Sequence, residues 1–293
     1  MNWWKDLKGK IKTREPLKKH STFKIGGRAE FFIEPKDTDA LKLLLALAKR
    51  YNIPLLIIGA GSNILISDKG VKAIVLRLGS PFFKEVFRKR NYLEAGSGLM
   101  LGRLLLVAKN HGLSGLEFLA GIPGTVGGAL AMNAGAWGKN IAEVVEKVKV
   151  MDYNGKTKIL AKKDIKFTYR SSGLAKYIIL SATFKLEKKD KKEIADEIKK
   201  YLTYRRNNQD TSFPNAGCIF KNPGGESAGR LIDLCGLKGK KTGGASVSTR
   251  HANFILNRGN ASSGDVLKLM SLIKKRVKDK LKITLEPEIK IWS

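Results

Sequence analysis

The amino-acid sequence predicts an α+β protein built from three blocks. The first block contains a β-α-β unit, in which two short apolar stretches flank a segment with helical apolar spacing. The second block, residues 92–186, is mostly strand-like and has one helix inserted. The third block follows a run of charged residues and alternates helices with short strand-like stretches.

The composition indicates a globular protein. The chain has 293 residues, of which 43% are hydrophobic, and this is enough for two or three packed layers. No apolar run approaches the roughly 20 residues that cross a bilayer. Residues 1–20 lack the apolar centre of a signal peptide. We therefore expect a cytoplasmic protein.

The charge is strongly positive, with 56 Lys and Arg against 26 Asp and Glu, a formal net charge of +30. This charge favours anionic partners: nucleic acid, a membrane surface or phosphorylated small molecules. The cations are spread through every element and the aromatic residues are not interleaved with them, so we do not expect nucleic-acid binding. Trp3 and Trp4 could rest on a membrane surface, but we expect them to pack on the protein body.

The cysteine content gives no framework for disulfides or metal. Cys218 and Cys235 are the only two cysteines, too few for a disulfide scaffold. No Cys or His residues have the spacing of zinc ligands. We therefore expect no metal site.

The elements of the first block follow from local patterns. Residues 29–35, "AEFFIEP", predict a strand that Pro35 ends. Residues 37–52 predict a helix with Asp37 as the N-cap and Leu41, Leu44, Leu45 and Ala48 on one face. Residues 54–59, "PLLIIG", are continuously apolar and predict a buried strand. Residues 72–78 are again extended in style.

The later blocks are predicted in the same way. Strands are expected at residues 92–98, 177–186 and 285–292, and residues 246–257 are expected to end in a strand. Helices are expected at 99–112, 194–209, 227–239 and 262–281. Gly112 and Gly236 are expected to end helices, and Ser262 or Ser263 to cap the last one. Residues 145–160 form a hairpin pattern in which Asn154-Gly155 favours a type I′ turn.

Two glycine-rich stretches are candidate ligand loops. Residues 59–63, "GAGSN", follow the first apolar strand and can present backbone N–H groups to a phosphate. The stretch is neither a Rossmann G-x-G-x-x-G motif nor a Walker loop. Taken alone, it is as well explained by an ordinary tight turn.

The second stretch, residues 121–138, "GIPGTVGGALAMNAGAWG", is too rich in glycine for a regular helix or strand and too apolar for a disordered linker. We therefore expect a buried, irregular segment. Two such loops suit a ligand with a pyrophosphate, such as a dinucleotide. The alternative is a pair of tight strand crossings that bind nothing.

Several segments together resemble one family. They are, in chain order, "TFKIGGRAEFFIEP", "PLLIIGAGSNILISDKG", "GLEFLAGIPGTVGGALAMNAGAWG", "FTYRSS", "PNAGCIFKNP", "SAGRLIDLCGLKG", "HANFILN" and "LEPEIKIW". From about Ser21 to Trp292 the chain resembles UDP-N-acetylenolpyruvoylglucosamine reductases, flavoenzymes that complete UDP-N-acetylmuramic acid for the bacterial cell wall.

The resemblance implies an architecture. Residues 1–20 would be a basic extension. Residues 21–187 would form an FAD domain of the vanillyl-alcohol-oxidase type, with two subdomains that meet near residues 79–91. Residues 188–293 would form a C-terminal α+β substrate-binding domain. The segment between "FTYRSS" and "YIILSATF" is short, which resembles the subtype that lacks the long substrate-capping loop.

The resemblance also implies FAD as cofactor and NADPH as hydride donor. The pyrophosphate of FAD would lie on Gly59, Ala60, Gly61, Ser62 and Asn63. The flavin ring and adenosine would lie along the second loop, on Gly121, Pro123, Gly124, Thr125, Gly127, Gly128 and Ala129. Some relatives of this fold tether the cofactor through a histidine or cysteine, but these two loops contain neither. We therefore expect non-covalent FAD.

Three residues match the catalytic positions of the family. NADPH would reduce the flavin, and the hydride would then pass to the enolpyruvyl group. Arg170 would stabilise the charge that develops on the enolpyruvyl carboxylate, since a guanidinium is always charged. Glu288 would help to polarise the carboxylate and protonate the intermediate; spacing alone does not separate it from Glu286.

Cys218 stands where most members of the family have the serine that donates a proton. A thiol with a reference pKa of about 8.5 is a stronger acid than a serine hydroxyl, but it loses its proton if neighbouring cations lower its pKa. The alternative is an inert, packed cysteine. Cys235 fits that description better.

Four further residues would contact the substrate: Tyr169, Gln209, Lys221 and Asn222. Asp210 departs from the family, in which a proline commonly follows the position of Gln209.

We expect a monomer that binds small molecules only. The alternatives are a flavin oxidase or dehydrogenase acting on another alcohol or sugar, and a basic nucleic-acid-binding protein.

Overall fold

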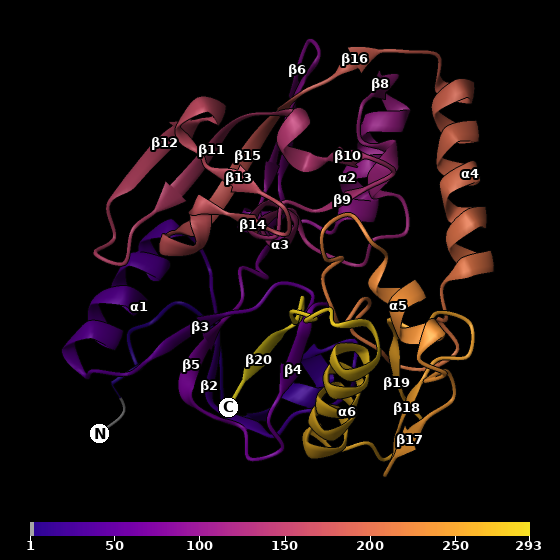
Figure 1. Ribbon diagram of the computed structural model, residues 1–293. Helices are drawn as coiled ribbons and strands as arrows, with labels where there is room; N and C mark the ends of the chain where they lie inside the picture. Colours follow the sequence, from indigo (N-terminus) through magenta and orange to yellow (C-terminus); the bar gives the residue numbers. More distant parts are fainter. Residues whose placement is uncertain (1–2) are drawn as a thin grey trace. The chain divides into compact units, whose positions relative to one another are not determined.

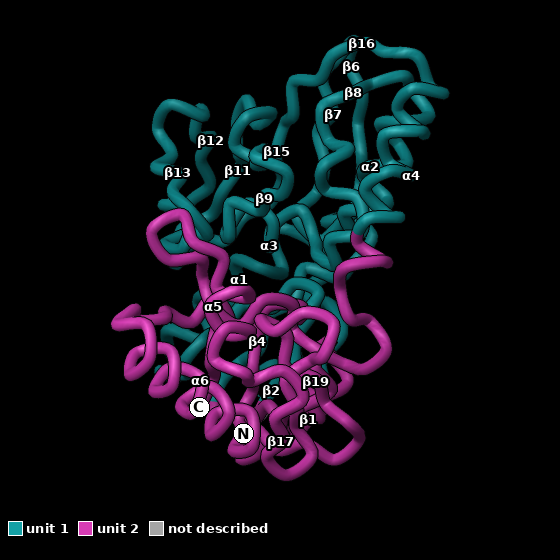
Figure 2. Tube along the Cα trace, turned by 45° about the vertical axis from the view of Figure 1, so that its right-hand side comes forward, with its two compact units in different colours: residues 1–13, 31–60, 73–204 teal, residues 14–30, 61–72, 205–293 magenta. Residues whose placement is uncertain are grey.

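The computed structural model describes residues 3–293, and its helices and strands are shown in Figure 1. The chain divides into two compact units. Unit 1 holds residues 1–13, 31–60 and 73–204, and unit 2 holds residues 14–30, 61–72 and 205–293 (Figure 2). Neither unit is one continuous stretch of chain. Strands β1 (Gly9–Pro16), β2 (Arg28–Pro35) and β5 (Val71–Leu76) and helix α4 (Lys191–Asn208) each contain residues of both units.

One hydrophobic cluster of unit 1 forms around helix α1 (Thr38–Arg50). A carboxylate oxygen of Asp37 accepts from the backbone N–H groups of Asp39 and Ala40, which confirms Asp37 as the N-cap. The predicted apolar face of α1 is buried in this cluster. Trp3 and Trp4 pack against the same cluster and contact Phe31. Both tryptophans therefore pack on the body of the protein, as expected.

The strand in the "PLLIIG" segment, β3 (Leu55–Ile57), corrects one expectation. The sheet has the order β1-β2-β5-β3, with β3 parallel to β5 at its edge. Leu55 and Leu56 are only half-buried, and Ile57 is 38% exposed. The prediction of a buried strand was wrong because an edge strand has a neighbour on one side only.

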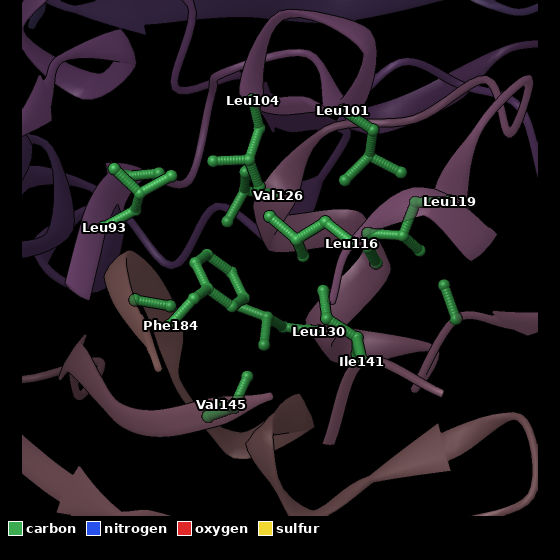
Figure 3. Packing of buried hydrophobic residues seen from close by; sticks show 14 of the residues in the cluster. Leu93, Leu101, Leu104, Leu116, Leu119, Val126, Leu130, Ile141, Val145 and Phe184 are labelled. Carbon is green, nitrogen blue, oxygen red and sulfur yellow. The ribbon is translucent and has the colours of Figure 1, made fainter. Parts of the chain in front are cut away.

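The second cluster of unit 1 lies on an antiparallel sheet. Its order is β12 (Thr157–Ala161), β11 (Val145–Met151), β15 (Ile178–Lys185), β7 (Tyr92–Gly96) and β6 (Val86–Lys89). Helices α2 (Leu101–Asn110) and α3 (Val126–Ala131) contribute to the same cluster. Figure 3 shows Leu104, Val126, Leu130 and Phe184 converging on one another. Gly112 follows α2 in a left-handed conformation, as predicted.

Two local predictions in unit 1 were wrong. Part of the glycine-rich segment 121–138 is helical, because Thr125 caps α3 by accepting from the N–H of Gly128. The β11–β12 turn is not of type I′, which requires two central residues with positive φ. Only Gly155 has a positive φ there, and Asp152 accepts from the N–H groups of Asn154 and Lys156 instead.

Unit 2 has its own core. Helices α5 (Ala228–Leu234) and α6 (Ser263–Leu281) pack against each other and share one hydrophobic cluster. A small antiparallel sheet contains β17 (Lys241–Thr242), β18 (Ala245–Val247) and β19 (Ile255–Asn257), and β4 (Ile64–Ile66) pairs in parallel with β20 (Lys290–Trp292). The hydroxyl of Ser262 accepts a hydrogen bond from the backbone N–H of Asp265, which confirms the predicted cap of α6. The final strand is shorter than predicted: it begins at Lys290, whereas the predicted strand covered residues 285–292.

The remaining strands form two-residue pairs: β8 (Leu113–Ser114) with β16 (Glu187–Lys188), β9 (Gly135–Ala136) with β10 (Lys139–Asn140), and β13 (Phe167–Thr168) with β14 (Ser171–Ser172). Within residues 3–293, no helix combines the length and the apolarity that crossing a membrane requires.

Candidate functional site

The turn that precedes Cys218 is shaped by one asparagine. The side-chain oxygen of Asn215 accepts from the N–H of Gly217 at 2.9 Å, and its amide nitrogen donates to the carbonyls of Asp210 and Phe213. Gly217 has a φ of +73°, which favours glycine. These contacts fix the direction of the backbone as it reaches Cys218. Cys218 itself is half-buried.

The segment after this turn runs between two other segments of unit 2. On one side, Ile219 N–H donates to Asn253 O at 2.9 Å, and Cys218 forms an isolated bridge with Phe254. On the other side, Glu288 N–H donates to Ile219 O at 2.8 Å. The backbone of Glu288 therefore lies beside that of Ile219, the neighbour of Cys218. The two predicted proton donors come from adjacent segments.

The structure distinguishes the two glutamates that spacing left open. Glu286 is exposed, and its carboxylate pairs with Lys221 Nζ at 3.2 Å. Glu288 is half-buried. The interaction between Glu286 and Lys221 is therefore a surface ion pair, of the kind that contributes little to stability. It engages the ammonium group of Lys221, which is a predicted substrate contact.

Three of the five residues of the first glycine loop, Gly61, Ser62 and Asn63, belong to the same unit. Gly61 has a φ of +65°, and a Cβ there would collide with the carbonyl oxygen of His20. Asn63 contacts the last segment of the chain twice: its amide nitrogen donates to Glu288 O at 3.3 Å, and its carbonyl accepts from Lys290 N–H at 3.0 Å. The predicted cofactor residue Asn63 thus holds the segment that carries Glu288.

The other substrate positions in unit 2 also make internal contacts. Asn222 Oδ1 accepts from the N–H of Ala228 at the start of α5, at 3.0 Å. Gln209 Oε1 accepts from Arg205 Nη1 at 3.4 Å. These interactions orient both side chains near the ends of helices.

Asp210, which follows Gln209, is a buried carboxylate that the family pattern did not explain. Burial by itself would raise the pKa of Asp210, but hydrogen bonds from the hydroxyls of Ser212 and Ser248 and the charge of Arg250 lower it below its ordinary value of 3.8. Ser248 Oγ in turn accepts from the N–H groups of Arg250 and His251. Asp210 therefore fastens the end of α4 to the loop before β19.

His251, in the "HANFILN" segment, has no role assigned from the sequence. Burial lowers the pKa of His251, and its Nδ1 accepts from the N–H of Asn253 at 3.3 Å. The ring is therefore neutral at neutral pH, and it stacks at an angle on Phe254 with a centroid distance of 4.6 Å. It supports the segment that borders Cys218.

In unit 1, the two glycine loops meet. A Cβ on Gly59 would lie 2.6 Å from Thr125 Oγ1, and a Cβ on Gly127 would lie 3.0 Å from Ser97 Cβ. Ser97 Oγ is buried and has no hydrogen-bond partner within residues 3–293. Buried hydroxyls normally have a partner, so an orphaned one beside Gly127 fits a site that a polar ligand completes. No sequence motif pointed to Ser97, although it lies in the "EAGSG" turn.

Arg170 lies at the tip of the β13–β14 hairpin, also in unit 1. Its φ is +55°, uncommon for a residue with a side chain. Its Nη1 donates to Gly135 O at 3.0 Å. Two side chains fasten the hairpin to residues 131–133: Asn133 Nδ2 donates to Thr168 O at 3.1 Å, and Ser172 Oγ donates to Ala131 O at 3.1 Å. Arg170 is therefore tied to the C-terminal part of the second glycine-rich stretch, residues 121–138.

The predicted site residues divide between the units. Unit 1 holds Gly59, Ala60, the loop 121–129, Tyr169 and Arg170, and unit 2 holds residues 61–63, Gln209, Cys218, Lys221, Asn222 and Glu288. Tyr169 is 54% exposed, and Arg170 lies 5.4 Å from its ring centroid. Among residues 3–293, no cluster of His, Cys, Asp or Glu could hold a metal ion.

Comparison with known proteins identifies the family of the chain. Residues 29–161 match the profile of an FAD-binding domain, which defines the class as a flavoprotein. Residues 208–292 match the C-terminal domain of UDP-N-acetylenolpyruvoylglucosamine reductase. A protein of that name from Caldanaerobacter subterraneus is 43% identical over 285 residues, covering 97% of this chain and 94% of its own. The chain therefore belongs to the UDP-N-acetylenolpyruvoylglucosamine reductase family.

Solved structures support the fold. The UDP-N-acetylenolpyruvylglucosamine reductase of Thermus caldophilus has a TM-score of 0.84 and is 36% identical, and the match covers 97% of this chain and all of that one. A solvent-stable cholesterol oxidase has a TM-score of 0.51 and is 15% identical, with 63% of this chain and 39% of that chain covered. The second likeness concerns the fold alone, and it agrees with the predicted FAD-binding fold of the vanillyl-alcohol-oxidase type.

Proposed function

We propose that this protein uses NADPH and bound FAD to reduce the enolpyruvyl group of UDP-N-acetylglucosamine enolpyruvate. The product is UDP-N-acetylmuramate, a precursor of peptidoglycan. The observation that carries the proposal is the family match over 97% of the chain. It is supported by the placement of Cys218 and Glu288 on adjacent segments.

FAD bound to this protein would supply the hydride-transfer chemistry between NADPH and the substrate. We assign its pyrophosphate to residues 59–63 and its ring and adenosine to the loop 121–129, with Ser97 Oγ as an additional donor. No histidine or cysteine lies in either loop, so binding is non-covalent. The glycines allow close approach of the backbone to the ligand.

The protein must then manage the charge and the proton of the substrate. Arg170 binds the enolpyruvyl carboxylate, since its guanidinium is permanently charged and can form paired hydrogen bonds. Cys218 donates the proton to the carbon that becomes electron-rich. Glu288 polarises the carboxylate and assists this protonation.

A thiol in this role makes the reaction sensitive to pH in a specific way. Cys218 can donate only while it holds its proton, and the reference pKa of a thiol is about 8.5. A serine hydroxyl does not ionise in the same range. Raising the pH is therefore expected to weaken the proton-donating step of the wild-type protein more than that of a Cys218→Ser variant.

The remaining assignments complete the proposal. Tyr169, Gln209, Lys221 and Asn222 contact the substrate, and binding by Lys221 competes with its ion pair to Glu286. Residues 21–187 act as the FAD domain and residues 188–293 as the substrate domain. The enzyme works as a cytoplasmic monomer.

The function is tested by following the absorbance of the purified protein. A yellow protein is expected whose colour is bleached by NADPH under anaerobic conditions and restored by UDP-N-acetylglucosamine enolpyruvate. Recovery of the colour with O₂ but not with the enolpyruvyl substrate would indicate an oxidase. A protein that takes up no FAD would contradict the proposal.

A further inference from the structure

Thr22 connects two parts of the candidate site that are far apart in the sequence. Its hydroxyl donates to the carbonyl oxygen of Asn215 at 2.7 Å. Its backbone N–H donates to the carbonyl oxygen of Gly61 at 3.0 Å. One half-buried residue therefore contacts both the first glycine loop and the turn that leads into Cys218.

The contact with Asn215 depends on the side chain of Thr22. The other contacts of the turn are made by Asn215 itself and by Asn257 N–H, which donates to Pro214 O at 2.9 Å. Loss of the Thr22 hydroxyl would leave these contacts in place. The turn would keep its shape but lose its direct attachment to the segment that borders Gly61.

The attachment lies close to the proposed proton donor. Cys218 follows Asn215 by three residues, with the left-handed Gly217 between them. A shift of the Asn215 carbonyl is therefore passed along a short, well-defined stretch of backbone. Proton transfer requires donor and acceptor within hydrogen-bond reach, and small misplacements of reacting groups slow such steps strongly.

We propose that Thr22 is a positioning residue that sets the place of the Cys218 thiol relative to the cofactor loop. The inference rests on the proposed function, because it assumes that Cys218 protonates the substrate. Asn63 plays the matching part for Glu288, since its amide contacts the Glu288 carbonyl from the same loop. Thr22 gives the cleaner test, because Asn63 is also assigned to the cofactor.

The experiment compares Thr22→Val, which removes the hydroxyl and keeps the shape, with Thr22→Ser, which keeps the hydroxyl. The two half-reactions are measured separately by stopped-flow absorbance of the FAD-loaded protein. Thr22→Val is expected to slow reoxidation by the enolpyruvyl substrate about 10-fold and to leave reduction by NADPH within about twofold. Thr22→Ser is expected to restore reoxidation. Thr183→Val, which removes a hydroxyl from β15 of unit 1, serves as the matched control and should change neither rate.

A second readout does not need turnover. Peptide-resolved alkylation with iodoacetamide measures the reactivity of Cys218 and of Cys235 in the same sample. Cys235 lies at the end of α5, away from the Asn215 turn in sequence, and acts as an internal control. Thr22→Val is expected to change the labelling rate of Cys218 about threefold or more and to leave Cys235 unchanged.

The outcomes separate the two proposals. Equal changes at both cysteines, or a loss of both half-reactions together, would assign Thr22 a merely structural role and overturn the inference. Unchanged labelling of Cys218 and unchanged reoxidation in Thr22→Val would also overturn it. If the wild-type protein is not reoxidised by the enolpyruvyl substrate at all, the proposed function fails, and the labelling result still decides whether Thr22 positions the thiol.

Discussion

The segment around Cys218 and the hairpin that carries Arg170 are held in place by different means. Cys218 is followed by two buried residues, Ile219 and Phe220, which belong to the hydrophobic cluster of unit 2. Backbone hydrogen bonds border the segment on both sides. Arg170 lies in a turn between two-residue strands, in a left-handed conformation, next to the exposed ring of Tyr169.

This difference indicates how substitutions in the two segments should affect the protein. A proton donor needs a fixed position, and the Cys218 segment is fixed by the core of its unit. A cation that binds a carboxylate can be carried by a long side chain on a lightly braced turn. We therefore expect mutations near Cys218 to reduce stability, and mutations near Arg170 to affect substrate binding more than stability.

The largest effect is expected for Asn253→Ala. The buried Asn253 side chain accepts from Phe220 N–H and donates to Phe220 O, at 2.9 and 2.8 Å. Its loss leaves two buried backbone groups unpaired, which is expected to cost about 3 kcal/mol of unfolding free energy. Urea unfolding measures this cost. Asn154→Ala, in the exposed β11–β12 turn, is the control and should cost less than about 0.5 kcal/mol.

A smaller and pH-dependent effect is expected for Asp210→Asn. Because the folded pKa of Asp210 is lowered, its carboxylate contributes stability that is full above the ordinary value of 3.8 and is lost as the pH falls through the folded pKa. The variant should therefore be less stable than the wild type by about 1–2 kcal/mol at pH 7, and the gap should close in acid.

Unfolding titrations at several pH values measure this gap. Asp233→Asn, which removes an exposed carboxylate that pairs with Lys238, provides the comparison and should change stability by less than about 1 kcal/mol. A gap for Asp210→Asn that stays constant down to pH 2 would show that hydrogen bonding to the ionised form is not the cause.

The smallest loss of stability is expected for Asn133→Ala, about 1 kcal/mol. Asn133 braces the Arg170 hairpin through Thr168 O and also accepts from Ala142 N–H. Its loss should raise the KM for the enolpyruvyl substrate and leave flavin reduction by NADPH unchanged. Asn133→Gly relieves the left-handed φ of 42° and separates strain from loss of the brace. If Asn133→Ala costs more stability than Asn253→Ala, the comparison of the two segments is wrong.

Much of the fold could be predicted from local chemistry. Asp37 and Ser262 were recognisable as caps, because each stands directly before a helical apolar pattern. The exposure of β3 was not predictable, since it depends on the order of strands in the sheet. The glycines of α3 were misleading, because the packing of Gly127 against Ser97 overrides their low helix propensity.

The sequence pointed to individual residues of the candidate site, but it did not reveal the contacts between the segments that carry them. Motifs pointed to Cys218 and Glu288, but only the fold shows that their segments are adjacent. The Thr22–Asn215 hydrogen bond joins residues 193 positions apart, a separation at which no local pattern gives a signal. The pair between Lys221 and Glu286 was hidden in the same way.

The central claim, that Cys218 is the proton donor, is tested most directly by the two half-reactions of Cys218→Ala and Cys218→Ser. Anaerobic stopped-flow absorbance follows both steps in one protein preparation. In Cys218→Ala, reduction by NADPH should stay near the wild-type rate, and reoxidation by the enolpyruvyl substrate should fall by about 10²-fold or more; Cys218→Ser should stay active. Reoxidation at the wild-type rate in Cys218→Ala would contradict the account.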